Sequence, residues 1–341
     1  MSYAGNAFNK LFLSILIKMK TTLNILLLSL IAFLSSCEKI IEFDGELTKP
    51  KLTVNAVATP DTVVIAGISR ELPFTDVIPE RSWESLYPDF VLEDAEATIT
   101  VNGSNIYQMQ YNPESLNYES TYIPAEGDEI LLNVSAPDLE SVKSVVVVPV
   151  KGKLEILGTE VLYSENHFVY DDWMDSGAFD TIMRITAKIS DPPGETNYYR
   201  LKVRSIGYQT NANGDYGYVM SDVFSSADVI FKDERLVKRY WGWPAGFSNV
   251  FDDHLFDGKE YTFTLETRMR WGSNQHVVVE LQSITRGLFN YLKSVMLYRI
   301  TDQDSYTESV QIYSNITGGY GIFGALNGEK HLLYFNTEMN R

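Results

Sequence analysis

The residues best suited to a defined chemistry lie at the end of a short apolar run near the N-terminus. Leu34, Ser35 and Ser36 precede Cys37, which is the only cysteine in the 341 residues. An apolar residue three positions before a cysteine, followed by two small residues, is typical of a lipobox, where a signal peptide is cleaved and the cysteine takes a lipid. Several acyl chains on one residue give stable anchoring, because each buried methylene contributes about 0.8 kcal/mol. We therefore expect Cys37 to carry lipid, palmitate included, and to anchor the protein to a membrane.

The residues before Cys37 follow the order of a signal peptide. Met19 and the lysine after it precede an apolar run over residues 23–33, which is too short for a comfortable membrane-spanning helix of about 20 residues. Residues 1–36 are therefore predicted to be a signal peptide. Its true start is expected at Met19, because the segment ahead adds an apolar piece that a signal peptide does not need. Residues 37–50 are predicted to be the lipidated cysteine and an acidic tether. The alternative is a plain secretory signal with an incidental cysteine.

Catalytic motifs are missing from the sequence. The four histidines are His167, His254, His276 and His331. No two of them have the four-residue spacing of a helical metal site, and no phosphate loop ends in Gly-Lys-Ser/Thr. The Gly-x-Ser-x-Gly of a nucleophile elbow is also missing. A triad can assemble from distant positions, so a surface hydrolase that uses His254 and His276 stays an alternative. We predict a protein that is not an enzyme and has no catalytic residues.

Two groups of aspartates could supply the oxygen ligands that calcium prefers. They are Asp252 and Asp253 with Asp257, and Asp171 and Asp172 with Asp175. Neither group matches the twelve-residue calcium loop, because no glutamate stands at its closing position. We interpret both groups as solvated turn residues and predict no metal and no cofactor, with calcium as the alternative.

An aromatic stretch is the best candidate for a ligand or partner contact. Tyr240, Trp241, Trp243 and Phe247 alternate with glycine and proline. Such a loop can present rings to a sugar or peptide, or serve as an anchor for a partner protein. The alternative is a loop that folds back so that its rings fill the edge of a core.

The first half of the mature chain shows the period-two alternation of β-strands. Residues 51–150 hold short apolar runs separated by turns such as Asn102-Gly103-Ser104, a pattern typical of an immunoglobulin-like β-sandwich. The predicted strands cover residues 52–56, 63–68, 97–101, 106–111, 120–123, 129–135 and 143–148. Residues 71–90 are predicted to be a long loop, because they are rich in proline, acidic residues and aromatics.

Residues 151–341 are predicted to form a second β-rich domain that carries one packed amphipathic helix. Its predicted strands cover residues 182–190, 198–206, 261–267 and 276–281. The helix is expected near residues 285–300, where large apolar residues recur at three- and four-residue steps and Thr285 can cap the first turn. Residues 315–325 contain four glycines among aromatics and are predicted to be a loop where backbones approach closely. The fold class is therefore mostly β.

The charge and composition exclude one class of partner and one source of stability. The chain has 45 acidic and 28 basic residues, a formal net charge of −17, and such an acidic protein repels nucleic acid. With its single cysteine lipidated, the chain can form no disulfide. Its 45% hydrophobic content is ample for stabilising cores instead.

Several stretches of this sequence together resemble a known family. They are the lipobox, Asp191-Pro192-Pro193-Gly194 leading to Asn197-Tyr198-Tyr199-Arg200, Phe251-Asp252-Asp253 with Phe256-Asp257-Gly258-Lys259, Tyr291-Leu292-Lys293-Ser294, and Ser314-Asn315-Ile316 with Gly319-Tyr320-Gly321-Ile322-Phe323-Gly324. The chain resembles the Bacteroidetes lipoproteins called domain of unknown function 4249, over nearly all of the mature sequence. The resemblance implies an outer-membrane lipoprotein, commonly encoded beside a TonB-dependent transporter. It assigns no activity and no catalytic residues.

These observations lead to one main expectation and two alternatives. We expect a lipid-anchored outer-membrane protein, on the cell-surface face, that acts as a non-enzymatic accessory or ligand-capture subunit of a TonB-dependent nutrient uptake system. Its partners would be membrane lipid through Cys37, the transporter, and a small molecule, glycan or peptide. The first alternative is a structural or adhesive cell-surface β-sandwich protein, and the second is the surface hydrolase.

Overall fold

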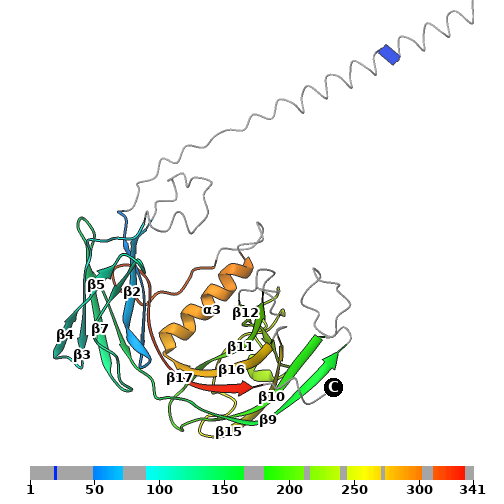
Figure 1. Ribbon diagram of the computed structural model, residues 1–341. Helices are drawn as coiled ribbons and strands as arrows, with labels where there is room; N and C mark the ends of the chain where they lie inside the picture. The colour runs from blue at the N-terminus through cyan, green and yellow to red at the C-terminus, as the bar shows by residue number, and fades with distance from the viewer. Residues whose placement is uncertain are drawn as a thin grey trace, which may run out of the picture. The chain divides into compact units, whose positions relative to one another are not determined.

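The computed structural model describes residues 19–20, 49–71, 90–164, 180–210, 216–238, 244–269, 273–301 and 310–334. The chain divides into a unit over Met1–Thr48 and a compact unit over Lys49–Arg341, and the second unit contains every strand named below (Figure 1). Within the described residues, no helix combines the length and apolar character needed to cross a membrane. Apart from Met19 and Lys20, the predicted signal peptide lies outside the described residues, as do Cys37 and most of the tether.

Two sheets enclose the first core. One contains β1 (Leu52–Thr59), β2 (Thr62–Arg70), β6 (Asn117–Glu119) and β5 (Gln110–Asn112), and the other has the order β4 (Asn105–Gln108), β3 (Glu96–Val101), β7 (Glu129–Ser135), β8 (Val142–Val147). Alternate residues of these strands point inward, so that Val54, Ile99 and Leu132 are almost fully buried in one cluster. This part is a two-sheet β-sandwich, and its immunoglobulin-like character stays a prediction.

The second core lies between a further four-stranded sheet and other strands of the sheet that contains β1. A four-stranded sheet has the order β13 (Phe224–Ser225), β15 (Glu260–Arg268), β10 (Asp180–Ser190), β9 (Lys153–Ser164). The facing strands are β12 (Tyr216–Ser221), β11 (Tyr198–Thr210), β16 (Ser273–Ile284) and β17 (Tyr320–Tyr334), with β14 (Val250–Asp252) paired to β11 and the 3-10 helix η2 (Val229–Phe231) beside them. Buried rings such as Phe231, Phe251 and Phe263 fill the space between the two sheets.

The last strand, β17, connects the two sandwiches into one sheet. Its first residues pair in parallel with β1, and its remaining residues pair antiparallel with β16, so a nine-stranded sheet runs through both halves (Figure 1). The close approach depends on Gly321, whose φ is +105° and where a Cβ would clash with the Val54 carbonyl oxygen. The predicted loop over residues 315–325 is therefore wrong from Tyr320 onward, although the predicted close approach of backbones there is confirmed.

The helix α3 (Arg286–Thr301) packs on the large sheet and confirms the predicted helix. Leu288 joins Val250, Ile284 and Ile322 in a small apolar cluster between helix and sheet. The hydroxyl of Thr285 accepts a hydrogen bond from the Leu288 amide at 3.4 Å, as expected for an N-terminal cap. The prediction of a mostly β chain with one packed helix is thus confirmed for the described residues.

Two of the predicted strands need correction. The strand predicted over residues 106–111 is two strands in different sheets, which separate at the buried Met109. The strand predicted over residues 120–123 is wrong, because β6 ends at Glu119. Beyond that point the Ser120 hydroxyl accepts from the amides of Val64 and Tyr122, both at 3.2 Å, and the regular strand stops there.

Candidate functional site

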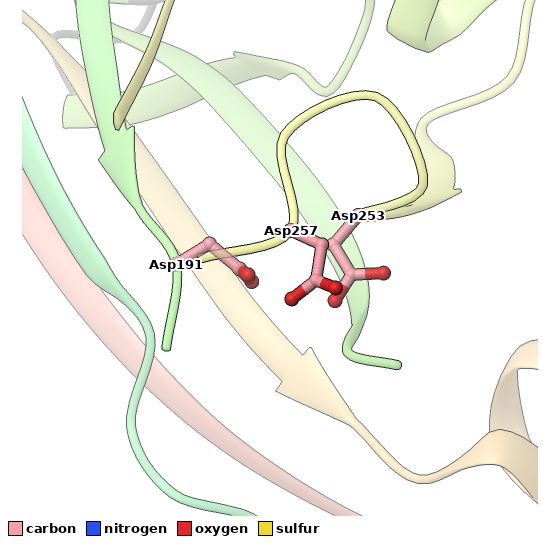
Figure 2. A group of neighbouring side chains, drawn as sticks. All are labelled: Asp191, Asp253 and Asp257. Atoms are coloured by element: carbon pink, nitrogen blue, oxygen red, sulfur yellow. The ribbon is translucent and has the colours of Figure 1, made fainter. Parts of the chain in front are cut away.

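Three aspartates from two separate turns gather at one end of the second sandwich. Asp191 follows β10, whereas Asp253 and Asp257 lie in the turn after β14. One carboxylate oxygen of each lies within 4.8 Å of the others. Figure 2 shows Asp253 and Asp257 side by side in one loop, with Asp191 directed toward them from the neighbouring segment. Carboxylates that converge in this way are the ligands that a hard cation prefers.

Hydrogen bonds between the two turns account for most of this arrangement. Asp191 accepts from the Tyr199 hydroxyl at 2.6 Å and from the Gly258 amide at 2.9 Å. Asp253 accepts from the Asn197 amide at 2.7 Å. The third carboxylate, that of Asp257, accepts from the amide of Gly194 at 3.3 Å. Each aspartate therefore already joins one turn to the other.

Burial and like charge act together on Asp191. Burial raises its pKa most, and the nearby carboxylates of Asp253 and Asp257 raise it further, while the hydrogen bonds from Tyr199 and Gly258 act in the opposite direction. Burial and the bond to Asp191 likewise raise the pKa of the Tyr199 hydroxyl. A bound cation would relieve this repulsion, but calcium takes six to eight oxygen ligands, and these three carboxylates already hold backbone amides. The arrangement fits a clamp between two turns better than a calcium site.

The sequence found only part of this cluster. Asp253 and Asp257 belong to it, but Asp252 does not, because its carboxylate contacts the ring of the neighbouring His254 instead. The sequence did not predict that Asp191 belongs to the cluster. The only local feature that points to it is the Asp-Pro-Pro-Gly turn that it begins. The second predicted group, over residues 171–175, lies outside the described residues.

An open cleft of about 670 Å³ lies over β15 and the segment after β13. Polar residues form most of its lining, which consists of Ser225, Ser226, Ala227, Asp228, Pro244, Thr262, Phe263, Thr264 and Glu266. Thr262 and Thr264 are exposed because the residues that alternate with them point into the core. A hydroxyl-rich floor with two carboxylates can hydrogen-bond a ligand that carries several donors.

The aromatic stretch meets this cleft at Pro244. Tyr240, Trp241 and Trp243 lie outside the described residues. Phe247 is buried, with its ring 5.7 Å from that of Phe231 and in edge contact with Phe224. For Phe247 the alternative interpretation, a ring that fills the core, is therefore the one the structure favours.

The described histidines do not assemble into one site. His254 lies in the turn after β14, His276 in β16 and His331 in β17. In the register of β16 and β17, His331 lies opposite Val279, an odd number of residues from His276, so the two rings project from opposite faces of the sheet. His167 lies outside the described residues. The geometry gives the hydrolase alternative no support from these residues.

A buried polar group beneath α3, formed by Lys293, Asp233 and Ser248, could not be predicted from the sequence. Lys293 lies 2.9 Å from the Asp233 carboxylate and 2.9 Å from the Ser248 hydroxyl. Burial alone would raise the pKa of Asp233, but hydrogen bonds from Arg235 and Lys293 outweigh it and hold that pKa far below its usual range. Ser248 is buried and donates its proton to the Val250 carbonyl at 2.8 Å, so this serine–lysine contact stabilises the helix and offers no accessible nucleophile.

Comparison with known proteins places the chain in a family. A search of the curated proteins found no match. A family model described as a domain of unknown function (DUF4249) matches residues 38–331, which include both sandwiches, α3 and the aspartate cluster. The chain therefore belongs to this family of domains of unknown function.

Proposed function

We propose that this protein is a lipid-anchored, non-enzymatic capture or accessory subunit of a TonB-dependent nutrient uptake system, held on the cell-surface face of an outer membrane. The observation that carries the proposal is the sequence Leu34-Ser35-Ser36-Cys37 at the end of a short apolar run. A lipidated cysteine confines the folded unit to a membrane surface, which raises its effective concentration near a partner in that membrane.

The cleft over β15 supports a binding role. Its lining includes the hydroxyls of Ser225, Thr262 and Thr264 together with the carboxylate of Asp228 and the ring of Pro244. Hydroxyls and carboxylates suit sugar hydroxyls or peptide amides. The transporter as partner is an expectation that comes from the family resemblance.

Affinity purification from native outer membranes, followed by mass spectrometry, tests this proposal. We expect a tagged full-length chain to recover a TonB-dependent transporter in a defined ratio. The matched control is Cys37→Ala. This variant should be absent from the membrane fraction and should not co-purify with the transporter, but it should keep its β-rich circular dichroism spectrum. Recovery of the wild-type chain alone would contradict the uptake role.

An adhesive role has one observation in its favour. On the outer face of the small sheet of the first sandwich, Ile106 is 71% and Val145 is 54% exposed. The register joins them through Thr100 and Leu131 into one lateral row across β4, β3, β7 and β8. Exposed apolar rows of this kind occur at protein contacts. If adhesion is the function, Val145→Thr should reduce attachment of cells to surfaces without changing growth on any nutrient.

A further inference from the structure

The face of the large sheet that carries α3 changes abruptly from apolar to charged. Under the helix, Tyr198, Ile284 and Leu326 stand side by side on β11, β16 and β17 and contact the helix cluster. Because side chains alternate along a strand, the next rows on this face lie two and four residues further along. Those rows are Arg200–Gln282–Gly328 and Lys202–Glu280–Lys330.

Two polar atoms in the first of these rows are buried without a partner. Within the described residues, the Nε of Arg200 and the Oε1 of Gln282 make no hydrogen bond. Gln282 is only 5% exposed, and its other terminal atom donates to Glu280 at 2.8 Å. Buried polar groups in folded proteins nearly always have partners, so a donor and an acceptor left open on neighbouring strands require an explanation.

The nearby carboxylate is held away from Arg200. Glu280 accepts from Gln282, and a Cβ at Gly328 would lie only 2.8 Å from its Oε1. The same Oε1 is 4.0 Å from Lys330. Glu280 therefore leans over β17 because Gly328 leaves room there, whereas Arg200 lies on β11, on the opposite side of β16.

The positive charges on β11 are incompletely neutralised. Arg204 pairs with Asp222 at 2.8 Å, and Lys330 on β17 pairs with Asp61 at 2.7 Å. Arg200 and Lys202 have no ion pair among the described residues, and the carboxylates of Glu280 and Asp222 act on them only at longer range. Burial lowers the pKa of both groups, and Arg200 lowers that of Lys202 further. A local excess of positive charge is unusual in a chain whose net charge is −17.

We propose that Arg200 and Lys202 form a binding site for an oxyanion, the carboxylate or phosphate group of a small molecule, with Gln282 accepting a hydrogen bond from the same ligand. A guanidinium presents several donors in a planar fork that matches such an oxyanion, and a lysine adds a compact charge beside it. The ligand supplies the acceptor that Arg200 lacks and the donor that Gln282 lacks. This proposal does not depend on the transporter or on the cleft over β15.

Titration of the full-length protein with inorganic phosphate and with acetate, in separate series at constant ionic strength, tests the site. Either probe should raise the melting midpoint in a saturable way, because a ligand that binds only the folded state stabilises it. Acetate supplies only the acceptor for Arg200, whereas hydrogen phosphate also carries the O–H donor that Gln282 lacks. A response to one probe alone identifies the oxyanion. Arg200→Gln and Lys202→Gln should each weaken binding by roughly tenfold or more, as expected for loss of a charged hydrogen-bonding group. Arg184→Gln and Lys188→Gln are matched controls on β10, in the four-stranded sheet of the second sandwich, and should bind as the wild type does.

Two results would overturn the proposal. The first is no saturable response to either probe, which would leave water as the partner of Arg200. The second is that the control variants weaken phosphate or acetate binding as much as Arg200→Gln and Lys202→Gln do. The binding would then depend on the overall charge of the protein and not on this site. If Arg200→Gln does not fold, Lys202→Gln decides the question, because Lys202, unlike Arg200, has no buried atom without a partner among the described residues. We expect the ligand-free Arg200→Gln protein to melt no lower than the wild type, since the substitution removes a buried charge without an ion pair.

Discussion

Replacing Lys293 with methionine removes the central cation beneath α3. The side chains of Lys293 and Asp233 are only 12% and 7% exposed, and their charged atoms lie 2.9 Å apart. Methionine has a similar length and no charge, so the substitution leaves the packing of the helix nearly intact. What changes is the environment of Asp233, which loses one of its two cationic partners.

The expected loss of stability is about 2–3 kcal/mol, just below the ~3–5 kcal/mol range for breaking a buried ion pair. The full range does not apply because Arg235 keeps bonds of 2.9 and 2.8 Å to the same carboxylate. Removing both charges together, in Asp233→Asn with Lys293→Met, should restore part of the loss, since no buried charge is then left without its partner.

Urea unfolding followed by circular dichroism measures these differences as shifts of the midpoint at constant slope. Lys188→Met is the control, because Lys188 also forms ion pairs, with Glu155 and Glu260, but both of these carboxylates are well exposed. The control should show no measurable loss. Two results would refute this role of Lys293. One is that Lys293→Met shows no loss of stability, and the other is that the double variant loses more stability than the sum of the losses of the two single variants.

Three further predictions follow from the described contacts. Gly321→Ala should lower the melting midpoint, because its Cβ would clash with a carbonyl oxygen of β1, whereas Gly158→Ala, with no atom within 4 Å of its Cβ, should not. The pKa of Asp233 is lower in the folded protein than the ~3.9 of an unfolded aspartate. Its contribution is therefore fully present above about pH 4 and lost as pH falls toward the folded value, and the stability gap to Asp233→Asn should close in acid unfolding curves. Chelation with EDTA should leave the melting midpoint unchanged, and a midpoint that falls with EDTA would instead support a calcium site. Asp191→Ala should lower the free energy of unfolding by about 2–4 kcal/mol, the sum expected for the lost hydrogen bonds from the Tyr199 hydroxyl and the Gly258 amide.

Local patterns were sufficient to predict the elements whose signals are local. The strand predicted over residues 129–135 coincides with β7, because its alternation matches one buried and one open face. The helix was predicted from the spacing of its large residues and from Thr285, and both are properties of consecutive turns. The Asn102-Gly103 turn is likewise local, with φ values of +50° and +72°.

Elements that depend on distant partners were predicted poorly. The first residues of β17, up to Ala325, were predicted to belong to a glycine-rich loop, because glycine is rare in strands. Gly321 is instead what lets this strand lie against β1. β9 was not predicted, although it pairs along its whole length with β10, with a register shift near Gly158. The same reason applies to the aspartate cluster, since nothing near Asp191 in the sequence indicates that it faces Asp253.

The two candidate binding places belong to different sheets, and this separation has a consequence that can be tested. The cleft lies on β15 in a four-stranded sheet, whereas the row of Lys202 lies on the nine-stranded sheet. That row is fixed from both sides, because β17 pairs with β1 and with β16, and Lys330 bonds to Asp61 in the β1–β2 turn. Substitutions at sites without shared partners usually act additively. Thr262→Ala should therefore leave phosphate or acetate binding unchanged, and Lys202→Gln should leave any ligand of the cleft unaffected, which would show two independent sites on one protein.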